Sequence, residues 1–157
     1  MQAEEKARRA GEGSAEVLAQ LHKVPGCENL TWNDVQIAST IFAVKPGDGS
    51  AREQAASCQR VLGAGANIVA EYATKRYRSN LINWGMLPLQ LVGATPFGLG
   101  DYVFIPNVRE ALKGDLPDIK AYVLGDTAKE FSLYMAPLTA DERKILADGC
   151  LINFYKH

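Results

Sequence analysis

The order of the elements in the first half of the chain is what most constrains the fold. Residues 35–44 (VQIASTIFAV) are rich in β-branched side chains and predict a buried strand, which Pro46 ends. Residues 51–62 predict a helix with small residues on its packing face, and Gly63 is well placed as its C-terminal stop. Residues 66–70 predict a second strand. A strand, a helix and a strand in this order predict two parallel strands joined by a right-handed crossover.

The rest of the chain predicts a larger, mixed sheet. A helix over residues 72–84 and a strand over 86–92 continue the parallel order, and Pro88 indicates a sheet edge or the start of a strand. Two apolar runs, 119–124 and 130–135, are joined by a turn and predict an antiparallel pair. Further expected elements are a strand over 102–105, a helical turn over 107–113 and a helix that a capping box opens at Thr139 and that ends near Gly149. These elements predict an α/β domain.

The beginning of the chain predicts a separate helical lead-in. Ser14 is expected to cap a helix that ends before Pro25. Residues 2–11 are charged and have little apolar spacing, so any helix there is expected to be weakly held. We therefore divide the chain into an N-terminal helical segment, residues 1–34, and a domain, residues 35–157.

Composition narrows the class of protein. A length of 157 residues suits one globular domain. The formal net charge of −1 gives no electrostatic reason to expect nucleic acid as a partner. No apolar run approaches the ~20 residues that span a bilayer, so no membrane partner is expected. Cys27, Cys58 and Cys150 are odd in number and widely spaced, so we expect no metal site in this chain. Free thiols fit a reducing compartment, and we expect a cytoplasmic location.

The loop before the first predicted helix, residues 47–53 (GDGSARE), is open to two interpretations. Ser50 and Glu53 fit the S-x-x-E capping box, with Ser50 as the N-cap. The same helix end offers unpaired N–H groups and a partial positive charge to an anion. Gly47 and Gly49 let a ligand approach the backbone closely, and Arg52 offers a planar fork to a carboxylate or phosphate. These seven residues alone do not decide between a plain helix cap and an anion site.

Three segments, in the same order along the chain, resemble the aconitase superfamily. The first, GDGSAREQAASCQRVLGAGANIV, is similar to that family's G-S-S-R-E-H-A-A loop with its following helix and strand. The second, SNLINWGMLPLQL, is similar to N-L-x-x-x-G-[LI]-L-P-L, and the third, LTADERKILADGCLINFYK, to the family's closing capped helix. The resemblance is collinear over residues 35–157. It implies the swivelling C-terminal domain, a β/β/α fold with a mixed sheet.

The resemblance also implies a reaction and a site. Enzymes of this family are hydro-lyases that dehydrate and rehydrate a hydroxy-di- or tricarboxylic acid. They are active only with a larger part, which carries a [4Fe–4S] cluster, so the expected partners are iron–sulfur-bearing domains or a large subunit. Carried over residue by residue, Ser50 would be the catalytic base and Arg52 would hold a substrate carboxylate. Gly49, Ser50, Ala51 and Arg52 are the expected substrate-binding residues.

The chain also departs from the family pattern. Ala51 stands where the family has a second serine, and Gln54 stands where it has a histidine. The segment D-x-x-x-T-D-x-I, which usually begins the domain, is not found before residue 35. We therefore expect an excised piece of a longer protein rather than a branch of the family that has lost this segment. The alternatives are the small subunit of an isopropylmalate- or homoaconitate-type isomerase and a non-catalytic relative that binds acids.

Overall fold

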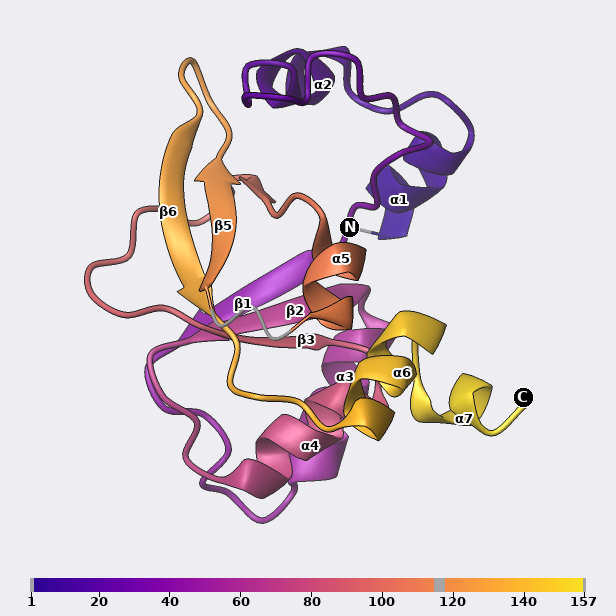
Figure 1. The fold of residues 1–157 in the computed structure, drawn as a ribbon, viewed down its shortest axis with the longest axis vertical. Helices are drawn as coiled ribbons and strands as arrows, with labels where there is room; N and C mark the ends of the chain where they lie inside the picture. The colour runs from indigo at the N-terminus through magenta and orange to yellow at the C-terminus, as the bar shows by residue number, and fades with distance from the viewer. Residues whose placement is uncertain (1, 115–117, 157) are drawn as a thin grey trace.

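The central sheet contains both parallel and antiparallel strands, as predicted. The computed structural model describes residues 2–114 and 118–156, which contain a six-stranded sheet in the order β1-β2-β3-β6-β5-β4 (Figure 1). The parallel half consists of β1 (Ser39–Ala43), β2 (Ala64–Val69) and β3 (Leu87–Gln90). The antiparallel half consists of β6 (Lys129–Tyr134), β5 (Asp118–Val123) and β4 (Val103–Phe104). This arrangement confirms the predicted α/β class.

The helices connect and cover the parallel half of the sheet. The crossovers are α3 (Arg52–Val61), from β1 to β2, and α4 (Lys75–Asn83), from β2 to β3. The later helices are α5 (Val108–Lys113), α6 (Ala140–Asp148) and α7 (Leu151–Phe154). The predicted capping box of α6 is present, because Thr139 Oγ1 accepts the Glu142 N–H and Glu142 Oε2 accepts the Thr139 N–H. In Figure 1, α3, α4, α6 and α7 gather on one side of the parallel strands.

Two apolar clusters hold these layers together. The larger one joins buried side chains of the sheet, such as Ile68 and Leu89, to Ile145 and Leu146 of α6. The smaller one lies between α3 and α4, where the fully buried Ala56 of α3 meets side chains of α4 and of the residues that follow it (Tyr77, Leu81 and Met86). Because α3 and α4 share this second cluster, the two loops that lead into these helices are held in a fixed relation to each other.

Two strand predictions need correction. The strand predicted as buried over residues 35–44 is shorter and lies at the edge of the sheet, where Ile41 and Phe42 keep 38% and 41% of their surface exposed. Its β-branched residues indicated a pleated strand, but they carried no information on whether a neighbour covers it. Pro88 is the second residue of β3 and is fully buried, so the strand-start interpretation was right and the sheet-edge one wrong. The only pairing of β3 with β6 among the described residues is at Gln90, beyond this proline.

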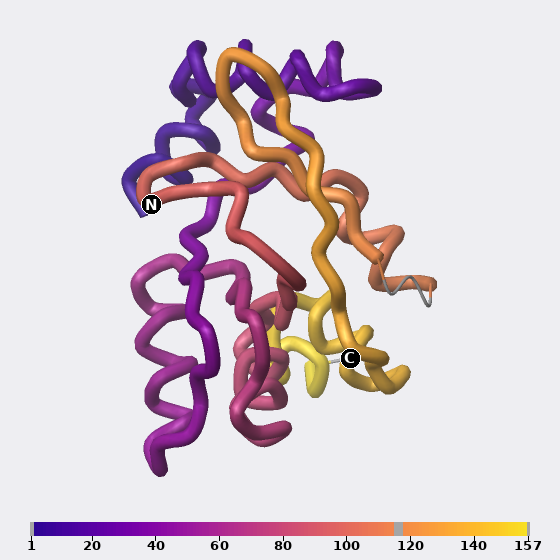
Figure 2. The backbone as a smooth tube through the Cα atoms, turned by 90° about the vertical axis from the view of Figure 1, so that its left-hand side faces the viewer, coloured from indigo at the N-terminus to yellow at the C-terminus, as the bar shows by residue number. Residues whose placement is uncertain are grey.

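The N-terminal segment packs across the end of the β5–β6 hairpin. It contains α1 (Gln2–Arg9) and α2 (Ala15–Leu21), and Ser14 caps α2 as predicted, by accepting the Val17 N–H. Val24 and Cys27 form a buried cluster with Tyr122 of β5. In Figure 2 this indigo segment lies beside the orange tip of the hairpin. The boundary at residue 34 stays a prediction. Within the described ranges, no helix combines the length and apolar character needed to cross a membrane.

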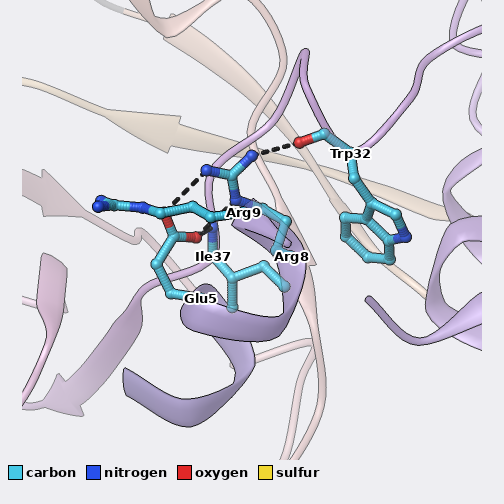
Figure 3. Close-up of polar contacts among 5 residues, drawn as sticks. All are labelled: Glu5, Arg8, Arg9, Trp32 and Ile37. Carbon is cyan, nitrogen blue, oxygen red and sulfur yellow. Dashed lines mark hydrogen bonds and ion pairs between the residues drawn. The ribbon is translucent and has the colours of Figure 1, made fainter. Parts of the chain in front are cut away.

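Charged groups anchor α1, which the sequence predicted to be weakly held (Figure 3). The Glu5 carboxylate accepts hydrogen bonds from Arg8 Nε at 2.7 Å, from Arg9 Nε at 2.9 Å and from the backbone N–H of Ile37 at 2.9 Å. Arg8 also donates to the carbonyl of Trp32. The Ile37 and Trp32 contacts cross 24 or more positions of sequence, so the local pattern of residues 2–11 contained no sign of them.

Replacing Glu5 by glutamine is expected to weaken the fold in a pH-dependent way. Burial on its own would raise the pKa of Glu5, but hydrogen bonds from Arg8, the Ile37 N–H and Arg9 outweigh it and lower the pKa from 4.5 to about 2. The carboxylate therefore stabilises the folded state above pH 4.5, and this contribution is lost as the pH falls from 4.5 towards 2. Glu5→Gln should lower the free energy of unfolding by about 1–2 kcal/mol at pH 7 and by less at pH 3.

Urea unfolding of the unchanged protein and of Glu5→Gln, each at pH 7 and at pH 3, measures this difference in the free energy of unfolding. Glu12→Gln is the matched control, since Glu12 is exposed and its charge change is the same. An equal loss for Glu5→Gln at pH 7 and pH 3 would contradict the proposed role of the ionised carboxylate.

Candidate functional site

The loop that carries the predicted site lies at the C-terminal ends of the parallel strands. In Figure 1 it is the purple loop at the bottom that leads into α3, at the opposite end of the molecule from α2. Backbone hydrogen bonds join it to the loop after β2, because the Ala73 N–H donates to Pro46 at 3.0 Å and the Glu71 N–H donates to Val44 at 2.9 Å. Two consecutive loops of the parallel unit therefore form one continuous edge, which is where open α/β sheets bind ligands.

The start of α3 differs from the predicted capping box. Its N-cap is Ala51, not Ser50, and no side chain accepts a hydrogen bond from the helix end at this position. Glu53, the predicted second member of the box, accepts instead from Trp84 Nε1 at 2.9 Å. The prediction failed because a partner 31 residues away takes the Glu53 carboxylate. The first N–H groups of α3 are thus left without a side-chain cap and carry the positive end of the helix dipole.

Arg52 is braced by its own loop. Its Nε donates to the Gly47 carbonyl at 2.8 Å, and its Nη2 donates to the Asp48 carbonyl at 3.3 Å. A guanidinium has five N–H donors, and these two bonds leave the two hydrogens of Nη1 and one of Nη2 without a hydrogen bond to the described residues. The half-buried side chain therefore keeps three N–H donors for an anion while its direction is already set.

Gly47 is fixed from the other side by α4. Its φ is +97°, and a Cβ at this position would lie 2.5 Å from Cβ of Tyr77, so only glycine fits. The Gly47 carbonyl also accepts a hydrogen bond from Thr74 Oγ1 at 3.1 Å. Thr74 is the N-cap of α4, whereas the sequence prediction placed it inside a helix over residues 72–84. The local signal for this cap was the residue type alone, because threonine is one of the preferred N-cap residues.

The side chain of Tyr77, which lies against Gly47, is buried and held by hydrogen bonds. The Tyr77 hydroxyl accepts from Asn67 Nδ2 at 2.9 Å and from Gln59 Nε2 at 3.0 Å. Asn67 is fully buried and lies on β2. Burial also raises the pKa of the nearby Tyr72 above its ordinary value, so its phenol stays protonated and donates to the carbonyl of Leu89. Sequence reasoning identified none of these residues, because their partners are far apart along the chain.

The structure brings the predicted site residues together on one exposed surface. Gly49, Ser50 and Ala51 are exposed, and Ser50 makes no hydrogen bond to the residues described. A Cβ on Gly49 would have no atom within 4 Å, so the space above the loop is open. Ser50 precedes the N-cap, and Arg52 is the first residue of the helix. A small acid held here would touch this chain on one side only.

The prediction that this chain holds no metal ion was drawn from its three cysteines. Cys27 is buried, Cys58 is exposed on α3 and Cys150 is the N-cap of α7, so the three thiols lie on separate parts of the fold. Among residues 2–114 and 118–156, no group of three or more His, Cys, Asp or Glu side chains is arranged to hold a metal ion. The donor set within these ranges therefore does not fit an iron–sulfur cluster.

The chain is similar in sequence and in fold to known proteins. The family described as "Aconitase C-terminal domain" matches residues 20–93. Aconitate hydratase A of Mycobacterium avium is 35% identical over 116 residues, which cover 69% of this chain and 12% of that protein. The chain thus corresponds to a small part of this relative's length.

The crystal structure of 3-isopropylmalate dehydratase from Methanocaldococcus jannaschii has a similar fold, with a TM-score of 0.51 and 28% sequence identity. The match covers 80% of this chain and 67% of that one. The family match over residues 20–93 contains the first two of the three segments that carry the resemblance. The chain therefore belongs to the aconitase superfamily and corresponds to the C-terminal swivelling domain of that family.

Proposed function

We propose that this chain is the swivelling domain of a hydro-lyase that dehydrates and rehydrates a hydroxy-di- or tricarboxylic acid. The observation that carries the proposal is the start of α3, where no side chain caps the helix and Ser50 and Arg52 lie two positions apart. A site of this kind suits a reaction in which negative charge grows on a carboxylate. Membership of the superfamily supplies the reaction class.

Ser50 is the proposed base. Serine removes a proton from carbon only as its alkoxide, and this alkoxide must be stabilised because the ordinary pKa of the hydroxyl is far above neutrality. The uncapped N–H groups at the start of α3 and the positive helix end would provide that stabilisation next to Ser50. The alkoxide would take the proton from the carbon next to a substrate carboxylate. The electron pair left on that carbon delocalises into the carboxylate, which the same N–H groups attract.

Arg52 is the proposed carboxylate clamp. Its two bonds to Gly47 and Asp48 hold the guanidinium in place before a ligand arrives, so little side-chain entropy is lost on binding. The remaining donors match the two oxygens of a carboxylate. Gly49 and Ala51 complete the site by leaving space around the loop.

The other half of the site is proposed to come from a partner part, on the same chain or on a separate large subunit. A [4Fe–4S] cluster held there would supply Lewis-acid assistance to the departure of the substrate hydroxyl. Closure of the partner part over the exposed loop would exclude water from the reacting groups. We place the assembled enzyme in the cytoplasm, because the three cysteines are free thiols.

A non-catalytic relative that binds acids is the second candidate. The observation that favours it is the N-cap of α3, where Ala51 has no hydroxyl. This candidate keeps the anion site at the helix end but lacks turnover.

The test uses the assembly of this domain with its iron–sulfur-bearing part, reconstituted without oxygen. Dehydration of citrate, isocitrate, homoisocitrate and isopropylmalate is followed by ultraviolet absorbance, and turnover of at least one of them is expected. Acid binding without turnover of any of the four would reject the hydro-lyase and support the second candidate.

In the same assay, Arg52→Lys is expected to raise KM by roughly 10- to 100-fold. A lysine presents a single ammonium group and cannot keep the two bonds to Gly47 and Asp48 while it also pairs with both oxygens of a carboxylate. Arg60→Lys is the control, because Arg60 lies near the other end of α3 and donates to Ala64. An unchanged KM in Arg52→Lys would remove Arg52 from the carboxylate site.

A further inference from the structure

We infer that Thr74 is a positioning residue for Arg52, acting through the carbonyl of Gly47. Thr74 does not reach the substrate in this scheme. It holds the carbonyl against which Arg52 is braced, and so it sets the direction in which the guanidinium presents its free donors. What Arg52 then binds rests on the proposed function, but the positioning itself does not.

The shared acceptor is the central observation. The Gly47 oxygen accepts from Arg52 Nε at 2.8 Å and from Thr74 Oγ1 at 3.1 Å. A carbonyl oxygen has two lone pairs, so both bonds form at the same time. The guanidinium of α3 and the hydroxyl at the start of α4 are therefore separated by one atom. Any shift of that oxygen moves Arg52 with it.

The Thr74 hydroxyl can hold this oxygen because it is itself fixed. As the N-cap of α4, Thr74 Oγ1 accepts the backbone N–H of Tyr77 at 3.2 Å. A hydroxyl has one hydrogen and two lone pairs, so it caps the helix and donates to Gly47 together. The hydrogen that points at Gly47 is thus oriented by the helix, and it is not free to rotate towards water.

The packing beneath the loop makes the link rigid. Gly47 lies directly against the ring of Tyr77, which is buried and held through its hydroxyl by Asn67 and Gln59. This packing fixes the position of the Gly47 Cα, whereas the hydrogen bonds from Arg52 and Thr74 hold the direction of its carbonyl. Loss of the Thr74 hydroxyl removes the one side-chain donor from α4 that reaches this carbonyl among the described residues.

The experiment reads the position of Arg52 without using catalysis. In the 157-residue chain, NMR measures how fast the Arg52 Nε hydrogen exchanges with water. Thr74→Val should increase this rate at least about tenfold, because the bond from Arg52 to Gly47 opens more often. Thr74→Ser keeps the hydroxyl and should restore the slow rate. Thr74→Gly lacks the hydroxyl but is a tolerated N-cap, so it replaces Thr74→Val if that variant does not fold.

Thr139→Val is the matched control, because it removes a threonine N-cap from α6 that has no bond to the loop. It should leave the exchange of the Arg52 hydrogen unchanged. Fast exchange in Thr74→Val or Thr74→Gly, with Thr74→Ser and Thr139→Val slow, would support the inference. Slow exchange in both variants that lack the hydroxyl would overturn it, and so would equally fast exchange in Thr139→Val.

A titration of the same proteins with tricarballylate, a tricarboxylate without a hydroxyl, separates this inference from the proposed function. Thr74→Val should weaken tricarballylate binding by roughly 3- to 10-fold if Arg52 holds a carboxylate. If exchange becomes fast while neither Thr74→Val nor Arg52→Lys changes the affinity, Thr74 still positions Arg52, and the proposed role of Arg52 in acid binding is wrong.

Discussion

Replacing Gly85 by alanine is expected to lower the free energy of unfolding by at least about 3 kcal/mol, which is a large part of the stability of a domain of this size. Gly85 follows the end of α4 with φ at +69°, a conformation that alanine adopts with strain. An added Cβ would also lie 1.6 Å from the carbonyl oxygen of Gly149 and 2.5 Å from its carbonyl carbon. The obstacle is backbone, so no side-chain rotation relieves it.

Relief would require α4 and α6 to separate. Gly149 is the C-cap of α6 and precedes α7, so its carbonyl is held by the ends of two helices. Moving α6 away from α4 would also open the contact between Arg78 of α4 and the carbonyls of Ala136 and Pro137, which lead into α6. The clash therefore propagates into the main core.

Gly26→Ala isolates the effect of the close approach. Gly26 has φ at +81°, but a Cβ there would have no atom within 4 Å, so only the backbone strain of about 1 kcal/mol applies. Urea unfolding followed by circular dichroism gives both values. A similar loss of stability in the two variants would show that the ends of α4 and α6 are not as close as described.

The elements that sequence predicted best are those specified by neighbouring residues. The β1–α3–β2 unit follows from apolar runs with glycines between them, and the capping box of α6 needs only Thr139 and Glu142. The pair β5–β6 likewise needs a turn between two apolar runs. In each case the residues that set the structure are adjacent in the sequence, so tertiary contacts reinforce a local preference.

The predictions that failed depend on partners far along the chain. Ser50 and Glu53 have the pattern of a capping box, yet the indole of Trp84 takes the carboxylate, and the helix starts at Arg52. The edge position of β1 also depends on residues outside the local window. Pattern reasoning cannot place such partners, because it has no measure of which segments meet.

The candidate site shows the same division. Resemblance to a family pointed to Ser50 and Arg52, and the glycines around them suggested an anion site. That Arg52 is braced by Gly47, and Gly47 by Thr74, follows only once α3 and α4 are packed side by side. The residues closest to the chemistry were therefore recognisable in the sequence, whereas the residues that orient them were not.

Ser50→Ala in the assembled enzyme is expected to reduce kcat by roughly 10²- to 10⁴-fold, the range lost with a general base. KM should change little, because the N–H groups of α3 and the Arg52 donors that hold the acid are unaffected. Dehydration is followed by ultraviolet absorbance at saturating substrate, and the iron–sulfur content of each preparation is matched. Loss of kcat with unchanged content then reports the missing base.

Ser57→Ala is the control for this change, since Ser57 lies on the same helix and its hydroxyl donates to the Gln54 carbonyl, one turn beyond the site. It should keep full turnover. Tricarballylate should still bind Ser50→Ala as it binds the unchanged domain, because only the proton acceptor is gone. If Ser50→Ala keeps its kcat, another residue removes the proton, and the start of α3 is reduced to a site that binds the carboxylate. A drop in kcat together with lost tricarballylate binding would instead mean that Ser50 shapes the loop, and the base would have to be sought in the partner part.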